Sequence, residues 1–191
     1  MKVAGRRWRG WIAGVLGVVV LGGACAAVLR RTAVAAPVGG PAPAFSLPDL
    51  QGRVRSLASL GGGDVVLRFG TLACTICDPD WAVLRRWQAA AGPGLHIAAV
   101  QERQPRAWVR QQLQGVRTGV PVLVDATGAV AARYGVQTLP SIAFIDRYGA
   151  LVAVEPVITR TGIWSTATWQ YYLGRLRRAD AAPAPRWFHS G

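Results

Sequence analysis

The residues with the clearest chemical potential are two cysteines, Cys74 and Cys77, separated by Thr75 and Ile76. Two intervening residues allow both sulfurs to meet across one helical turn and to close a short disulfide ring. A thiolate attacks a disulfide sulfur, so such a pair can exchange electrons with a substrate disulfide. The spacing therefore indicates thiol–disulfide redox chemistry, with a structural disulfide or a metal site as the alternatives.

The two cysteines are expected to have different roles. Backbone N–H groups at the N-terminus of a helix favour the thiolate of Cys74, which makes it the expected nucleophile. Cys77 would then resolve the mixed disulfide and release the reduced substrate. A zinc site would need two more ligands, and the two histidines, His96 and His189, stand in a predicted strand and in the C-terminal tail. We therefore predict no metal and no cofactor.

A strand before the cysteines and a helix after them would position the pair. Residues 64–69 form a β-branched run bounded by glycines, which predicts a buried strand. Asp78 and Pro79 supply a helix N-cap and a proline at the first helical position, so a helix is expected to continue to about Ala90. Asp78 and Asp80 act as capping residues in this interpretation, although a carboxylate close to Cys74 would disfavour its thiolate.

The rest of the chain alternates strands and helices before ending in a hairpin and a helix. Strands are expected at residues 95–100 and 120–125, helices at residues 105–114, 129–134 and 164–178, and a hairpin at residues 141–146 and 150–154. The expected inward-facing aromatic and aliphatic residues of these helices are Trp108, Leu113, Trp169, Tyr171, Tyr172 and Leu176. This order predicts an α/β fold with a mixed sheet, parallel at its centre and antiparallel at one edge, flanked by helices.

Several segments make the pattern more specific. They are residues 43–52, residues 65–69 leading into Cys74-Thr-Ile-Cys77, and residues 134–149, which contain Leu139-Pro140. Together they resemble the membrane-anchored TlpA/ResA branch of the thioredoxin superfamily, over residues 42–154. The resemblance implies a thioredoxin fold preceded by one transmembrane helix, and the activity of a protein disulfide reductase. It also suggests apocytochrome c cysteines as the substrate and a membrane thiol-relay protein as the electron donor.

The resemblance further implies that Pro140 is a cis proline packed against the cysteine pair. The backbone of Leu139 would then bind an extended segment of the substrate. The residues between the cysteines, Thr75 and Ile76, would support the same site. An ordinary trans proline at the end of a loop is the alternative interpretation of Pro140.

Arg68 departs from the family pattern, because relatives usually carry a carboxylate or an amide at this strand position. If Arg68 points toward Cys74 or Cys77, its positive charge would stabilise the thiolate and make the disulfide more oxidising. If it reaches the rim of the sheet instead, it would pair with a carboxylate. The sequence leaves both alternatives open.

An apolar segment precedes the predicted domain. Residues 10–29 carry no charged side chain and are long enough to span a bilayer as a signal-anchor helix. Basic residues gather before it, so residues 1–9 are expected in the cytoplasm and the domain on the periplasmic side of the inner membrane. Cys25 is expected to be a small apolar member of this helix. The alternative is a cleaved signal peptide, with secretion after cleavage near Ala35.

The remaining organisation follows from composition. Residues 30–43 are expected to form a linker, residues 44–178 the thioredoxin-like domain, and residues 179–191 a flexible tail. The net charge is +13, but the arginines are scattered and form no tract that would follow a phosphate backbone. We expect no nucleic-acid partner. The expected partners are an exported protein disulfide, a thiol-relay donor and the membrane.

Two further functions compete with the disulfide reductase. Thr71-Leu-Ala-Cys74 matches the Thr-x-x-Cys of peroxiredoxins, although Leu67 stands where those enzymes usually have proline. The cysteine pair could also hold a metal in a chaperone or assembly factor. The direction of electron flow is left open, because no rule derives a reduction potential from Thr75 and Ile76.

Overall fold

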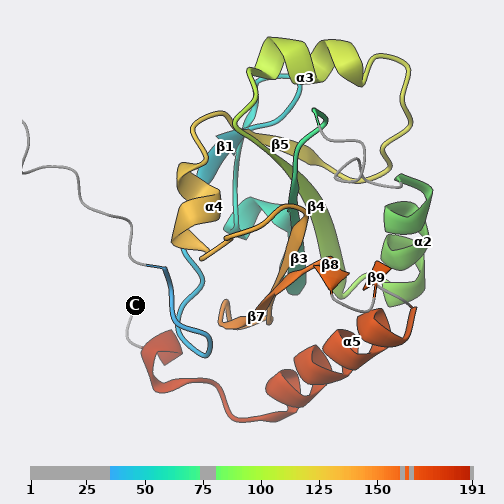
Figure 1. Cartoon of the computed structure of the whole chain (residues 1–191). Helices are drawn as coiled ribbons and strands as arrows, with labels where there is room; N and C mark the ends of the chain where they lie inside the picture. Colours follow the sequence, from blue (N-terminus) through green and yellow to red (C-terminus); the bar gives the residue numbers. More distant parts are fainter. Residues whose placement is uncertain (1–34, 74–80, 160–161, 164–165, 190–191) are drawn as a thin grey trace, which may run out of the picture. The chain divides into compact units, whose positions relative to one another are not determined.

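A five-stranded sheet forms the centre of the domain and carries helices on both faces (Figure 1). The computed structural model describes residues 35–73, 81–159, 162–163 and 166–189. The sheet strands are β3 (Asp64–Gly70), β4 (Leu95–Glu102), β5 (Val122–Asp125), β6 (Ser141–Ile145) and β7 (Leu151–Pro156). Their order across the sheet is β5-β4-β3-β6-β7.

The strand pairings confirm the mixed sheet that the sequence predicts. β3 pairs in parallel with β4, and β4 with β5, whereas β6 runs antiparallel to both β3 and β7. Gly70 pairs with Gln101 on one side of β3, and Phe69 pairs with Ser141 on the other. The carboxyl ends of β3 and β4 therefore share one edge of the sheet with the start of β6.

Four helices and several short elements complete the described part. The helices are α2 (Trp81–Ala91), α3 (Arg106–Gln112), α4 (Ala129–Arg133) and α5 (Thr166–Ala181). The short strands β1 (Ser46–Pro48) and β2 (Val54–Ser56) pair with each other, as do β8 (Ile158–Thr159) and β9 (Gly162–Ile163). Two 3-10 turns are η1 (Ala58–Leu60) and η2 (Arg186–His189). α5 extends beyond its expected end at Arg178.

Two hydrophobic clusters cover the two faces of the sheet. Side chains alternate along β3, so that Val66 faces one cluster while Leu67 and Phe69 face the other. Helices α2, α3 and α5 contribute to the first cluster, and α4 contributes to the second. In the first cluster Trp169 of α5 stacks on Trp87 of α2, with ring centroids 4.3 Å apart. This stacking joins two helices over one sheet face.

Trp108 packs against the first cluster as predicted but is less buried than expected, and Tyr171 is placed differently. Trp108 is half-buried at the edge of the first cluster, and the next residue, Val109, takes the fully buried position in α3. Trp169 and Leu176 are buried and Tyr172 is half-buried, but Tyr171 is 58% exposed. Consecutive residues on a helix point about 100° apart, so one position in a run of aromatic residues is turned toward solvent.

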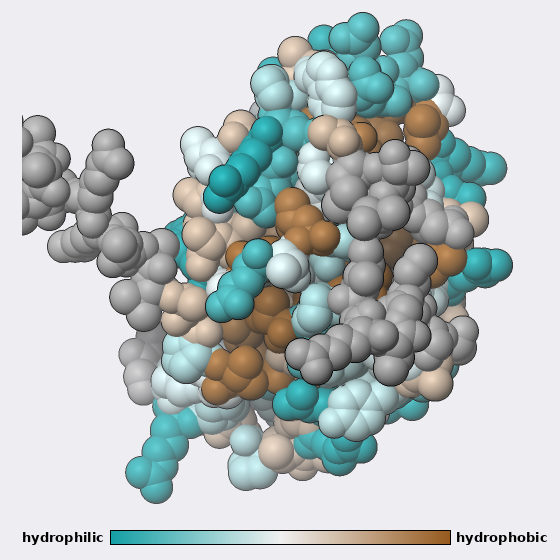
Figure 2. Space-filling view, in the orientation of Figure 1, coloured by the Kyte–Doolittle hydropathy of each residue, from teal (hydrophilic) through white to brown (hydrophobic). Residues whose placement is uncertain are grey.

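Polar side chains dominate the surface of α3. Figure 2 shows hydrophilic residues over this helix, at the top of the view. The residues Arg106, Arg110 and Gln112 of α3 are all exposed. The solvated arginines agree with a basic surface that is spread over the domain.

The predicted anchor, residues 10–29, lies outside the described residues. Within the part that the structure describes, no helix combines the length and the apolar composition needed to cross a membrane.

Candidate functional site

The chain leaves β3 in a tight turn that leads directly to the cysteine motif. Cys74, Thr75, Ile76 and Cys77 themselves lie outside the described residues, so their predicted arrangement stays a prediction. Residues 71–73 form the turn, in which the N–H of Ala73 donates to Oγ1 of Thr71 at 3.3 Å. The structure therefore fixes the point from which the first cysteine extends.

Leu139 and Pro140 lie at the same edge of the sheet. Their peptide bond is cis, which confirms that feature of the resemblance. The next residue, Ser141, begins β6 opposite Phe69, and the carbonyl of Pro140 accepts the N–H of Val157 at 2.8 Å. The turn toward Cys74 and the cis proline thus come from adjacent strands. The predicted contact of Pro140 with the cysteines falls outside the described residues.

Arg68 is buried, with 5% of its surface exposed, on the face of β3 that α2 and α5 cover. Its guanidinium lies against Gly70, where an added Cβ would come within 2.0 Å of Nη1. The side chain therefore extends along the strand toward its carboxyl end, which is the direction of Cys74 in the sequence. A glycine at position 70 provides the space that it needs.

The end of β4 adds a group of polar residues that the sequence analysis missed. Gln101 is fully buried, and no described residue hydrogen-bonds to its side-chain amide. Gln104 is 5% exposed, and its Oε1 accepts the N–H of Leu72 at 3.1 Å. The signal in the sequence was a polar run, residues 101–104, directly after an apolar strand.

Two charged residues lie between these glutamines. Glu102 is 8% exposed, and burial raises the pKa of its carboxyl even though Arg103 lies beside it. Nε of Arg103 is 3.0 Å from Oε1 of Glu102. Arg103 has a φ of 54°, in the left-handed region that residues other than glycine rarely adopt. Its N–H donates to the carbonyl of Asp125 at 2.9 Å, which supports this conformation.

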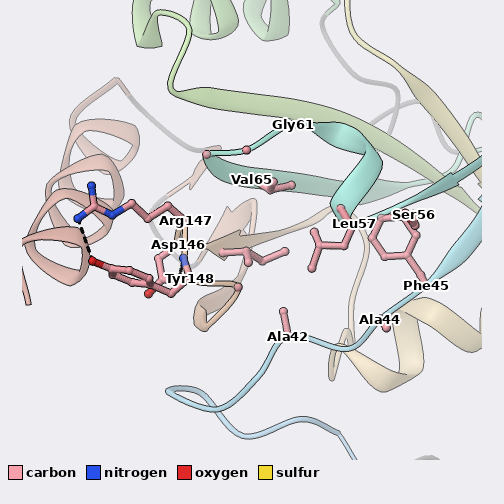
Figure 3. Close-up of a pocket in the computed structure, with 15 residues that line it drawn as sticks. Ala42, Ala44, Phe45, Ser56, Leu57, Gly61, Val65, Asp146, Arg147 and Tyr148 are labelled. Carbon is pink, nitrogen blue, oxygen red and sulfur yellow. Dashed lines mark hydrogen bonds between the residues drawn. The ribbon is translucent and has the colours of Figure 1, made fainter. Parts of the chain in front are cut away.

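A cavity lies at the opposite end of β3 from this edge (Figure 3). Its volume is about 400 Å³, and it is lined by Phe45, Leu57, Val65 and Ile145 with Asp146, Arg147 and Tyr148 at one side. Nη2 of Arg147 donates to the hydroxyl of Tyr148 at 2.9 Å. Because Val65 stands at the start of β3, this cavity is separated by the length of the strand from the turn that precedes Cys74.

The described residues offer no cluster of three or more His, Cys, Asp or Glu side chains suited to a metal ion. His96 is half-buried within β4, and His189 belongs to η2. Among the described residues, this edge presents two glutamine amides, the guanidinium of Arg68 and a cis proline.

Comparison with known proteins finds one matching family and several relatives of the chain. Residues 38–154 match the AhpC/TSA family. The chain is 32% identical to thiol-disulfide oxidoreductase ResA of Geobacillus thermodenitrificans over 133 residues, covering 69% of this chain and 74% of that protein. It is 26% identical to ResA of Bacillus thuringiensis over 116 residues, covering 60% of this chain and 67% of that protein.

Solved structures of thioredoxin-like proteins are also similar to this chain. The exposed lipoprotein thioredoxin Etrx1 of Streptococcus pneumoniae superposes with a TM-score of 0.60 and 27% identity, over 70% of this chain and all of that one. A secreted disulfide oxidoreductase of Mycobacterium tuberculosis, homologous to DsbE of Escherichia coli, superposes with a TM-score of 0.54 and 25% identity, over 70% and 95% of the two chains. The ResA proteins and the Mycobacterium tuberculosis protein are named as disulfide oxidoreductases and Etrx1 as a thioredoxin, so neither the peroxiredoxin nor the metal-chaperone interpretation is favoured.

Proposed function

We propose that this chain, which belongs to the AhpC/TSA family and is a thiol-disulfide oxidoreductase, reduces disulfides in exported proteins with Cys74 and Cys77 as its redox pair. The observation that carries the proposal is the edge where the turn before Cys74 and the cis peptide Leu139–Pro140 extend from paired strands. This edge lies at the carboxyl ends of parallel strands, where α/β proteins commonly bind ligands.

The proposed reaction proceeds in two exchanges. The thiolate of Cys74 attacks one sulfur of the substrate disulfide, forms a mixed disulfide and displaces the other sulfur, which takes up a proton. Cys77 then loses its proton and attacks the sulfur of Cys74, which releases the second substrate thiol. Two electrons pass to the substrate, and the enzyme keeps a Cys74–Cys77 disulfide. A dithiol on a membrane thiol-relay protein would reduce that disulfide for the next cycle.

The substrate would approach as an extended segment beside Leu139 and Pro140. Extended segments commonly bind proteins by pairing with exposed backbone groups. The names of the ResA relatives support thiol–disulfide exchange, and we propose the haem-binding cysteines of apocytochrome c as the substrate within that chemistry. Arg68 extends toward the carboxyl end of β3, and a guanidinium close to Cys74 would favour its thiolate and make the disulfide more oxidising.

We also propose that the chain is held in the inner membrane by residues 10–29, with its domain in the periplasm. The length and apolar composition of that segment support a membrane helix, and the basic residues before it support a cytoplasmic N-terminus. This placement would bring the redox pair to exported proteins and to a membrane-bound electron donor.

Trapping the reaction intermediate tests the proposed function. In the full chain, Cys77→Ser is expected to accumulate a mixed disulfide between Cys74 and a substrate protein, because the resolving thiol is lost. Cys74→Ser is expected to abolish both the trapped species and insulin reduction. A trapped species that forms through Cys77 in the Cys74→Ser variant, or the absence of any trapped species in the Cys77→Ser variant, would reject the assigned roles.

A further inference from the structure

Gln104 connects the end of β4 to the turn that precedes Cys74. Its Oε1 accepts the N–H of Leu72 at 3.1 Å, across a sequence separation of 32 residues. The glutamine side chain is 5% exposed, so little water competes for this bond. The hydrogen bond therefore joins the carboxyl ends of two neighbouring parallel strands at the edge where the cysteine motif begins.

The backbone before Gln104 is arranged in an unusual way. Arg103 has a φ of 54°, which costs free energy for a residue with a Cβ, and strained residues of this kind cluster at functional sites. Its N–H bond to the carbonyl of Asp125 and its pairing with Glu102 hold this conformation. Arg103 and Pro105 are exposed on either side, and Gln104 alone of the three is turned inward. The strained backbone at Arg103 thus directly precedes the one side chain of the three, that of Gln104, which is buried.

We propose that Gln104 is a positioning residue for thiol–disulfide exchange, which fixes the turn at Leu72 so that Cys74 meets a substrate disulfide in the orientation for attack. The inference rests on the proposed function, in which Cys74 is the nucleophile. Leu72 and Cys74 are two residues apart, so their Cα atoms are at most about 7 Å from each other. Motion of the backbone at Leu72 would therefore also move the sulfur of Cys74.

An amide suits this position better than a carboxylate. The neutral oxygen of Gln104 accepts the N–H of Leu72 without placing a negative charge near a thiolate. Gln104→Glu would keep the acceptor and the size of the side chain while adding charge. Gln104→Met would keep the size and remove the acceptor. These two substitutions therefore separate geometry from electrostatics.

The test measures insulin reduction by the reduced full chain from pH 6 to pH 9. Gln104→Met is expected to lower the rate at least threefold at every pH, because the defect is geometric. Gln104→Glu is expected to lower it only where the Cys74 thiol is incompletely ionised, and to recover to within twofold of the parent by pH 9. Gln112→Met, at an exposed glutamine of α3, serves as the matched control and should leave the rate unchanged.

Iodoacetamide alkylation of Cys74, followed by peptide mass spectrometry with Cys25 counted separately, gives the thiol pKa in each variant. An unchanged insulin rate in a folded Gln104→Met variant would overturn the proposal. If that variant does not fold, hydrogen exchange in the parent decides: the N–H of Leu72 should exchange at least tenfold more slowly than in an unstructured peptide, and unprotected exchange would overturn the proposal. If the parent chain cannot reduce insulin, the proposed function is refuted. The role of Gln104 is then decided by hydrogen exchange at the N–H of Leu72 and by the alkylation of Cys74.

Discussion

At the scale of single residues, Arg68 is the residue that the sequence analysis identified as a departure from the pattern of the resembling family. Its guanidinium is buried and lies against Gly70, near the carboxyl end of β3. Charges interact more strongly in such surroundings than in water.

The charge of Arg68 leads to a prediction about the thiol of Cys74. Arg68→Gln is expected to raise the pKa of that thiol by about 1 unit, because an opposite charge near a thiolate favours the ionised form. The measurement is the pH dependence of Cys74 alkylation in the full chain. Arg110→Gln removes the same charge from an exposed position of α3 and should leave the pKa unchanged.

Gly70→Ala tests the effect of Arg68 on the pKa of the Cys74 thiol in a second way. The added Cβ would come within 2.0 Å of Nη1 of Arg68, so the guanidinium must move. A raised Cys74 pKa in both Arg68→Gln and Gly70→Ala would locate the effect in the guanidinium. If the pKa stays at its parent value in both variants, Arg68 has no electrostatic role at the redox pair.

The sequence predicted the residues whose signal is local and missed those whose role depends on distant contacts. The resemblance carried by the Leu-Pro motif implied a cis proline, which the structure confirms, whereas the redox pair predicted from the cysteine spacing lies outside the described residues. Gln104 carried no such signal, because its bond to Leu72 spans 32 residues and depends on the backbone conformation of Arg103. A polar run after a buried strand was the one local clue.

At the scale of elements, the alternation of apolar runs was sufficient to predict the mixed sheet. β3 to β7 all occur close to their expected positions, because strand periodicity and glycine or proline breakers are local features. The rotation of helices was harder to predict, as Tyr171 shows. The end of α5 was also missed, since Asp180 near that end interacts with Asp64 and Arg147, which lie far away in sequence.

That interaction between β3 and α5 involves two carboxyl groups. Asp64 begins β3 and is 9% exposed, and its carboxyl is close enough to that of Asp180 for the two to interact electrostatically. Burial, and then the charge of Asp180, raises the pKa of Asp64 to about 7. Arg147 lies nearby, with its Nε 3.7 Å from Oδ1 of Asp180. The contact is therefore strongest when Asp64 is protonated.

The raised pKa gives a pH-dependent prediction for stability. An aspartate in the unfolded chain has a pKa near 3.8, whereas the pKa of Asp64 in the folded chain is about 7. The protonated carboxyl of Asp64 therefore contributes fully to stability below pH 3.8, and this contribution is lost as the pH rises to about 7. Asp64→Asn is expected to match the parent near pH 4 and to exceed it by about 1–3 kcal/mol at pH 8. Denaturant unfolding at both pH values measures the difference.

Asp49→Asn is a control of opposite sign. Burial alone would raise the pKa of Asp49, but hydrogen bonds from Arg53 and Gln51 outweigh it and lower the pKa. Loss of this carboxylate should therefore destabilise the fold at pH 8 and have a smaller effect as the pH falls through the acidic range. If the stability of Asp64→Asn stays parallel to that of the parent from pH 4 to pH 8, Asp64 does not titrate near neutral pH.

At the scale of the whole molecule, the proposed anchor determines which proteins the redox pair can meet. A retained helix at residues 10–29 predicts that the chain stays in the membrane after an alkaline carbonate wash. Protease added outside spheroplasts should then digest the domain. A shorter chain that begins near Ala36 and is released in soluble form would instead establish cleavage of the N-terminal segment.

The redox titration of the full chain tests the central claim most directly. The chain is equilibrated in glutathione buffers of graded potential, and the free thiols of Cys74 and Cys77 are counted by alkylation and mass spectrometry. We predict that both thiols disappear together in one two-electron step, at a low potential near about −270 mV; a potential toward about −120 mV would indicate an oxidant and contradict the proposed reduction of disulfides. If one cysteine is oxidised without the other, or both remain thiols in the most oxidising buffer, these residues are not the redox pair.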